Sequence, residues 1–329
     1  MNFIFRISQP GIRIMPSKIL VRVVRGETVE SVHRGHVVAI DGSGKSVFEI
    51  GDSKAVTYLR SSAKPFQALP FIAAGAADAF GFSEEEIAVA CASHSGEARH
   101  VRIAQLMLER IGLSEAHLRC GSHLPFYEKE AERMIRAGEH PTQLHNNCSG
   151  KHAAMLAFAR HIGADIAEYE NRDNPVQQAI LDTVARFSEI DKSEIRLGTD
   201  GCAAPNFAMP VIAMARMFAH LVSPPKFLAD NERSACGRIV SAMTKFPELI
   251  GGTERLDTML MQAAAGRIIS KVGADGVWLC GIIPCRQWPR GLGIALKIED
   301  GDDKRARPVV AVALLRELGI LSDKDLAEL

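Results

Sequence analysis

Strand-like segments lie at both ends of this 329-residue chain, and this arrangement restricts the folds open to it. The β-rich stretches are "KILVRVVRG", "GHVVAID" and "KSVFEIG" near one end, and "RIISKVGADGVWLCGII" and "GLGIALKIEDGDDK" near the other. Two separate small sheets would each leave unpaired edge strands. The sequence therefore predicts a single mixed α/β domain, residues 19–329. Its largely antiparallel sheet is built from both chain ends, residues 19–60 and 265–329, and is flanked by helices.

Helical patterns fill the region between these strands, residues 61–264, and predict a helical insertion. Ser83 and Glu86 have the spacing of a capping box. Asn174, followed by a proline, is typical of the start of another helix. The stretch "APNFAMPVIAMARMFAHLV", residues 204–222, also has a helical pattern.

Composition excludes several classes of partner. Residues 1–18 interrupt their apolar run with arginine, proline and glycine, so we expect a flexible extension with Met15 as an alternative start. No stretch reaches the roughly 18 apolar residues of a membrane span, so we expect no membrane partner. The formal net charge is zero, which does not favour a nucleic-acid partner. Seven cysteines do not suggest a disulfide framework, and we expect a cytoplasmic protein.

Ser61 and Lys64 in "LRSSAKPFQALP" are one helical turn apart and would share a face if a helix begins there. The lysine amine could then take the proton of the serine hydroxyl. Its pKa would have to fall from about 10.4 toward 7 or 8, through burial or a nearby cation. The alternative is a capping serine and a solvated lysine. The same spacing occurs at Ser223 and Lys226 in a predicted loop, so the spacing alone does not identify a catalytic pair.

Two further elements favour the catalytic interpretation. Serine acyl-transferases of the β-lactamase and penicillin-binding type combine a Ser-x-x-Lys helix with a central serine and a Lys-x-Gly strand. Here "CASHSGE" supplies Ser93 and Ser95 after a predicted helix, and "SKVGADG" places Lys271 on a predicted strand. A loop serine and a solvated strand lysine remain the alternatives.

Cysteines, histidines and a lysine gather at the start of a predicted helix in "HNNCSGKHAAM". Spacing alone nominates His145, Cys148 and His152 as zinc ligands, and Cys202 in "GTDGCAAPN" offers a second thiol. The chain has no paired Cys-x-x-Cys in this region. Buried cysteines and surface histidines are therefore the alternative explanation.

The blocks "SSAKPFQALP", "CASHSGE", "NNCSGKHAAML" and "GTDGCAAPNFA" resemble the rhizobial-type (class 3) L-asparaginases, from about residue 20 to the C-terminus. This resemblance implies a serine β-lactamase-like fold, shared with glutaminases, and a homodimer. It also implies two serine–lysine pairs in the active site, Ser61 with Lys64 and Ser93 with Lys271. Arg60, beside the first serine, becomes a candidate for contacting substrate or orienting the site.

The same resemblance implies a zinc cofactor held by Cys148, Lys151 and Cys202, with Asp200 orienting the cluster. It replaces His152 by Lys151 as the nitrogen ligand. A lysine ligand must be deprotonated, and zinc itself favours that. His152 is then a candidate substrate contact.

The resulting hypothesis is an amidohydrolase that converts L-asparagine to L-aspartate and ammonia through an acyl-enzyme on Ser61, with Ser93 as the alternative nucleophile. One competing hypothesis is another serine amidohydrolase on this scaffold, a glutaminase or a β-lactam-processing enzyme. The other is a zinc- or amino-acid-binding protein without catalysis, which would bind asparagine and release no ammonia.

Overall fold

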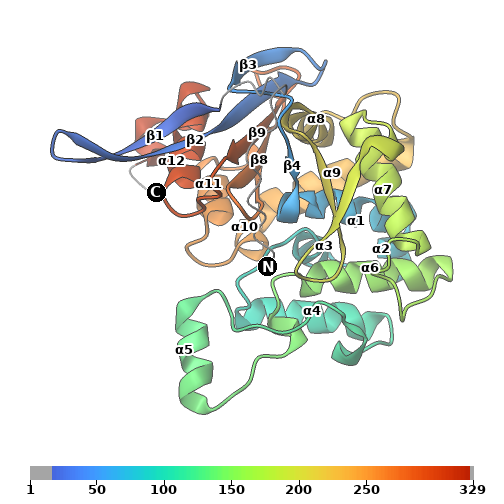
Figure 1. Cartoon of the computed structure of the whole chain (residues 1–329). Coiled ribbons are helices and arrows are strands. Elements are labelled where there is room, and N and C mark those ends of the chain that lie inside the picture. Colours follow the sequence, from blue (N-terminus) through green and yellow to red (C-terminus); the bar gives the residue numbers. More distant parts are fainter. Residues whose placement is uncertain (1–16, 327–329) are drawn as a thin grey trace, which may run out of the picture.

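A six-stranded antiparallel sheet forms the centre of the computed structural model, which describes residues 17–326 (Figure 1). Its strands run in the order β1-β2-β9-β8-β7, and β3 also pairs with β2. On one side, β2 pairs with β1 through residues 28–35 and with β3 through residues 37–40. On its other side, β2 pairs with β9. The strands are β1 (Lys18–Arg25), β2 (Thr28–Asp41), β3 (Ser46–Ile50), β7 (Ile268–Val272), β8 (Val277–Ile282) and β9 (Leu292–Ile298).

The sheet confirms the predicted fold class, since both ends of the chain contribute strands to it. Most of the predicted extension, residues 1–16, lies outside the described residues, and Lys18 already begins β1. None of the helices in the described part of the chain is long and apolar enough to span a bilayer.

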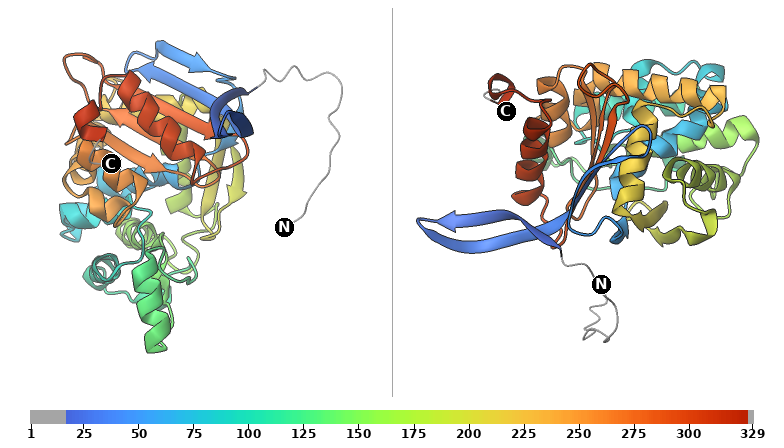
Figure 2. Two further views of the ribbon diagram at one scale, coloured as in Figure 1. Left: turned by 90° about the vertical axis from the view of Figure 1, so that its left-hand side faces the viewer. Right: turned by 90° about the horizontal axis from the view of Figure 1, so that it is seen from above.

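Helices cover both faces of the sheet. In Figure 2, α8 (Val211–Val222) lies on one side and α12 (Ala306–Glu317) on the other. The approach of α8 requires a glycine on β9, because a Cβ at Gly293 would lie 1.9 Å from the carbonyl oxygen of Ala215. The central strands are consequently buried on both faces, as their continuous apolar sequences require.

Ser83 and Glu86 form the expected capping box of one further helix, and Asn174 caps another as expected. The described chain has further helices, most of them on the same side of the sheet as α8 (Figure 2). They are α1 (Lys64–Ala73), α2 (Ala76–Ala79), α3 (Glu84–Ala90), α4 (Ala98–Arg110), α5 (Glu128–Ala137), α6 (Ser149–Ile162), α7 (Pro175–Ser188), α9 (Asp230–Lys245), α10 (Pro247–Ile250) and α11 (Leu256–Ala263), with α13 (Asp323–Leu326) at the end of the described chain.

A second, three-stranded sheet corrects the predicted helix over residues 204–222. Its order is β4-β6-β5, from β4 (Val56–Tyr58), β5 (Arg196–Thr199) and β6 (Pro205–Pro210), and only residues 211–222 form a helix. Pairing on both edges makes residues 205–210 a strand, although their local pattern is helical.

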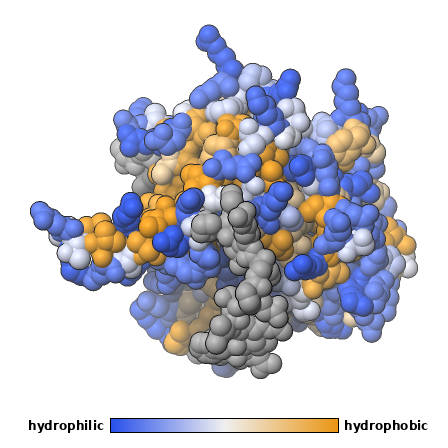
Figure 3. All heavy atoms as spheres, turned by 45° about the horizontal axis from the view of Figure 1, so that its top comes forward, coloured by the Kyte–Doolittle hydropathy of each residue, from blue (hydrophilic) through white to orange (hydrophobic). Residues whose placement is uncertain are grey.

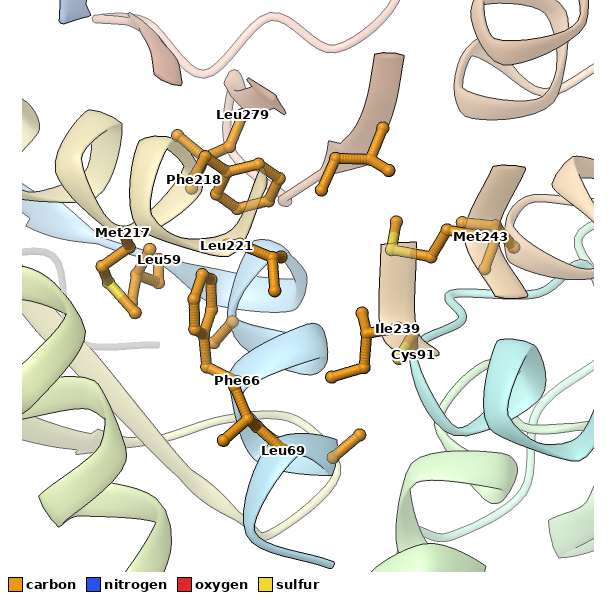
Figure 4. Packing of buried hydrophobic residues seen from close by; sticks show 14 of the residues in the cluster. Leu59, Phe66, Leu69, Cys91, Met217, Phe218, Leu221, Ile239, Met243 and Leu279 are labelled. Atoms are coloured by element: carbon orange, nitrogen blue, oxygen red, sulfur yellow. The ribbon is translucent and has the colours of Figure 1, made fainter. Parts of the chain in front are cut away.

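Aromatic packing fixes α1 against the other layers. The ring of Phe66 lies 5.4 Å from that of Phe187 and 5.6 Å from that of Phe218, both with edge-to-face geometry. Figure 4 shows Phe66 below Phe218, with Leu59 and Leu69 on either side along the chain. This packing positions the start of α1, where the predicted serine and lysine lie.

Candidate active site

The segment that carries Ser61 and Lys64 is a short 3₁₀ helix, Arg60–Ala63, running directly into α1. Arg60 has a φ of +53°, a region that non-glycine residues rarely occupy. Its N–H donates to the side-chain oxygen of Asn206 at 3.0 Å, which anchors the turn to β6. Pro65 falls in the first turn of α1, where a missing N–H has no helical partner to lose.

Lys64 is buried, and its amine is surrounded by acceptors. It donates to the carbonyl oxygen of Ala92 at 2.7 Å, to Oγ of Ser93 at 2.9 Å and to the carbonyl oxygen of Asn147 at 2.9 Å. Burial lowers the pKa of Lys64 from its ordinary value. Among the described residues, the hydroxyl of Ser61 has no hydrogen-bond partner. Lys64 therefore contacts Ser93, which is 29 residues away in sequence, and not Ser61.

Ser93 follows α3 in a segment held by its backbone. Its N–H donates to the carbonyl oxygen of Ile250 at 2.9 Å, and Oγ of Ser95 donates to the carbonyl oxygen of Gly251 at 2.8 Å. Ser93 is only 3% exposed, whereas Ser61 is half-buried and more accessible. The two serines therefore differ in access to a ligand.

Lys271 lies fully buried on β7 and pairs with a carboxylate rather than with Ser93. Its amine is 3.4 Å from Oδ2 of Asp257 and donates to the carbonyl oxygen of Val272 at 3.1 Å. Burial lowers the pKa of Lys271 to about 8, although the charge of Asp257 opposes the change. Asp257 also accepts hydrogen bonds from the N–H of Val272 and from Oγ of Ser270.

Sequence reasoning missed Asp257, because it is 14 residues before Lys271 in an unremarkable helix start. It also missed the support behind it, where Nε1 of Trp278 donates to Oγ of Ser270 at 2.8 Å. A buried lysine that stays charged needs a nearby anion, and this requirement is the signal that could have pointed to a carboxylate beside Lys271.

Two thiols and an amine converge beside this site, where α6 begins. Nζ of Lys151 lies 2.9 Å from Sγ of Cys202, and all three side chains are buried, with Cys148 at 5% exposure. A hydrogen bond from Cys148 lowers the pKa of the Cys202 thiol. Burial opposes a charge on Lys151, but the neighbouring sulfurs raise its pKa above its ordinary value. The cluster thus stabilises a thiolate next to an ammonium group.

The histidines nominated by spacing take different places. His145 caps its own 3₁₀ turn through Thr142 and stays outside the cluster. His152 is fully buried, and its Nδ1 lies 2.6 Å from the hydroxyl of Tyr169. Nε2 of His152 is buried without a hydrogen-bond partner in residues 17–326. Burial lowers the pKa of His152 to about 4, so the ring is neutral.

This donor set fits a zinc ion in kind, because two sulfurs and a nitrogen are typical zinc ligands and an unpartnered imidazole nitrogen lies nearby. No group of three His, Cys, Asp or Glu side chains in the described residues is disposed to hold a metal. A site here would therefore depend on Lys151.

Asp200 links this cluster to the start of α1. Its Oδ1 lies 3.2 Å from Nε of Arg60, and its charge contributes to raising the pKa of Lys151. The same arginine pairs with Asp275 at 2.5 Å. Ten of the residues singled out from the sequence thus lie around the neighbouring ends of α1, α3, α6 and β7 and in the loop between β5 and β6, while His145 stays outside.

Comparison with known proteins gives one family. Residues 21–329 match the family described as L-asparaginase II. A comparison with curated proteins gives no match. Similar solved structures include a Bacillus subtilis glutaminase in covalent complex with 5-oxo-L-norleucine, 11% identical with a TM-score of 0.43, covering 87% of this chain and 88% of that one. Another is a β-lactamase from Burkholderia ambifaria, 14% identical with a TM-score of 0.41, covering 88% and 94%.

Proposed function

Because the chain belongs to the L-asparaginase II family, whose members are amidohydrolases, we propose that it hydrolyses L-asparagine to L-aspartate and ammonia through an acyl-enzyme on Ser61. The observation that carries the mechanism is the buried amine of Lys64, which contacts Ser93 and lies one turn from Ser61. A lysine in this position can move a proton between two hydroxyls.

In the first half-reaction, Oγ of Ser61 attacks the side-chain amide carbon, and its proton passes to neutral Lys64. Backbone N–H groups at the helix start stabilise the oxyanion that forms on the amide oxygen. The C–N bond then breaks. Lys64 returns the proton through Oγ of Ser93, 2.9 Å away, to the departing nitrogen, which leaves as ammonia.

In the second half-reaction, water attacks the aspartyl ester and transfers one proton to Lys64. The ester C–O bond breaks and Oγ of Ser61 recovers that proton. The other proton of the water leaves the new carboxyl group for solvent, and L-aspartate departs. Lys271 acts through its charge, since its hydrogen bonds go to Asp257 and Val272. A positive charge there favours the developing oxyanion over the neutral amide.

Cys148, Lys151 and Cys202 would hold zinc beside this chemistry. A bound zinc ion would add positive charge near the substrate and keep its ligands deprotonated. Asp200 and Arg60 tie that cluster to the turn that carries Ser61, so the substrate and the nucleophile keep a fixed geometry.

The test is ammonia release from L-asparagine and L-glutamine by wild type, Ser61→Ala and Ser93→Ala. Ser46→Ala, an exposed hydroxyl on β3, is the control. We expect Ser61→Ala to lose at least about a thousandfold in asparagine turnover, because the nucleophile is gone. Normal turnover in Ser61→Ala with loss in Ser93→Ala would move the nucleophile to Ser93. No ammonia from either substrate, together with nitrocefin hydrolysis, would indicate a β-lactam-processing enzyme.

A further inference from the structure

Arg255 is a cationic side chain near the proposed site that forms no ion pair and no hydrogen bond with the described residues. It precedes α11, and its guanidinium carbon lies 5.6 Å from the ring centre of Phe126. Other arginines nearby are paired, Arg60 with Asp200 and Arg99 with the carboxylate of Glu97. Arg255 therefore differs from these arginines, because its guanidinium faces an aromatic ring instead of a carboxylate.

The loop that carries Arg255 is fixed to the segment after Ser93. Thr253 donates from its N–H and its hydroxyl to the two carboxylate oxygens of Glu97, at 2.7 and 2.9 Å. The carbonyl oxygen of Gly251 accepts the hydroxyl of Ser95 at 2.8 Å. These contacts hold the arginine in a defined place relative to the proposed catalytic serine.

The ring under the arginine is fixed to the same segment. The N–H of Tyr127 donates to the carbonyl oxygen of Ser95 at 3.1 Å, directly after Phe126. His123 stacks on Phe126 with ring centres 4.6 Å apart. Nε2 of His123 accepts the N–H of Asn147 at 3.2 Å, and the carbonyl oxygen of Asn147 accepts Lys64. Phe126 thus connects the arginine to the surroundings of the proposed base.

The charge of Arg255 acts on the site without being neutralised there. It contributes to lowering the pKa of Lys271. Asp257 and Asp303 are the nearby anions, but the oxygens of Asp257 bind Lys271, Ser270 and the N–H of Val272. Asp303 pairs with Arg307. Partial burial lowers the pKa of Arg255, although a guanidinium stays protonated at neutral pH. A half-buried cation without a partner gains free energy when it binds an anion.

We propose that Arg255, seated on Phe126, binds the α-carboxylate of the amino-acid substrate. This inference rests on the proposed function, because the substrate of that reaction carries one carboxylate and one scissile amide. A guanidinium presents two parallel N–H groups to a carboxylate, which gives direction as well as affinity. Arg255 would then be the residue that restricts the enzyme to amides that carry a free carboxylate.

Two analogues of asparagine separate this role from a structural one. 3-Aminopropanamide keeps the amine and the amide but lacks the carboxylate, and succinamic acid keeps the carboxylate but lacks the amine. In Arg255→Gln we expect kcat/KM for L-asparagine and succinamic acid to fall by on the order of 10- to 100-fold, mainly through KM. The value for 3-aminopropanamide should stay within about twofold, because that substrate has no group for the arginine to bind. Arg238→Gln, which removes an arginine of α9 paired with Asp78, is the matched control and should leave all three values unchanged.

An equal loss for all three substrates in Arg255→Gln would overturn the inference, and so would unchanged values. Arg255→Lys, which keeps the charge, should recover part of the asparagine rate and so exclude misfolding as the cause. Calorimetric binding of L-aspartate gives a readout independent of turnover and should weaken by a similar factor. If wild type released no ammonia from asparagine, the proposed function would fail. Weaker aspartate binding in Arg255→Gln would still support the carboxylate site, and equal binding would reject it.

Discussion

The two buried lysines of the site have different partners. Lys64 donates to two carbonyl oxygens and to Ser93, all neutral acceptors. Lys271 has the carboxylate of Asp257 at 3.4 Å. A carboxylate favours the charged form of an amine more than a neutral acceptor does. Lys64 is therefore suited to carry a proton and Lys271 to hold a positive charge, as the proposed mechanism requires.

A pH dependence follows from Lys271, whose pKa is lowered to about 8 by burial. The groups that act on it or lie near it are Asp257, Lys64, Arg255 and Cys91. Above pH 8 the folded protein loses this charge, so we expect kcat/KM to fall there. Asp257→Asn should move the fall to lower pH, because the carboxylate raises the pKa of Lys271. Activity independent of pH between 7 and 10 would contradict the assigned role.

Stability should change in the opposite direction over the same window. Between about pH 8 and 10.5 the unfolded chain keeps the proton of Lys271 while the folded chain has lost it. The free energy of unfolding therefore rises with pH there, by up to about 3 kcal/mol from this group. Urea unfolding at pH 7.5 and 10 measures the change, and in Lys271→Met this contribution should disappear.

At the level of single elements, the sequence predicts features that adjacent residues determine but misses features that depend on tertiary pairing. The capping box at Ser83 and the cap at Asn174 were predictable, because a few adjacent residues determine them. The strand at residues 205–210 was not predictable, because it forms only by pairing with β4 and β5. The contact between Lys64 and Ser93 was missed for the same reason, since it joins residues 29 apart through the packing of α1 and α3.

The junction of α3 and α6 gives an element-scale prediction. A Cβ at Gly150 would lie 2.4 Å from both Cγ1 and the carbonyl oxygen of Val89, so α6 can approach α3 only with glycine there. Gly150→Ala should cost about 1–3 kcal/mol in the free energy of unfolding and reduce turnover, because this turn positions Cys148 and Lys151.

Gly237→Ala is the matched control, since Gly237 lies inside α9 with nothing within 4 Å of an added Cβ. Alanine is the better helix former, so this variant should gain up to about 1 kcal/mol. Urea unfolding and ammonia release distinguish the two. A Gly150→Ala protein as stable as wild type would mean that the helices can separate without penalty.

At the scale of the whole molecule, the sheet has an arm that no other element among residues 17–326 pairs with. Residues 28–34 of β2 pair with β1 alone, because the pairing of β2 with β9 begins at Gly35 (Figure 2). Val24, Val29 and Val32 on this arm are 54%, 47% and 38% exposed, and Figure 3 shows apolar side chains on it at the left. A two-stranded ribbon is only marginally stable in water without further packing, and no strand of the described part of the chain pairs with the outer edge of β1.

We therefore expect the arm to pack against a second copy of the chain, as in the homodimer that the sequence resemblance implies. Val24 and Val29 pair across the arm, so Val24→Asp with Val29→Asp places two like charges in that contact. Sedimentation should give two chains for wild type and one for the double variant. Val47→Asp, equally a valine-to-aspartate change but on β3, should leave the assembly intact. A wild type that sediments as a single chain would contradict the dimer. A double variant that stays dimeric would move the contact away from the arm.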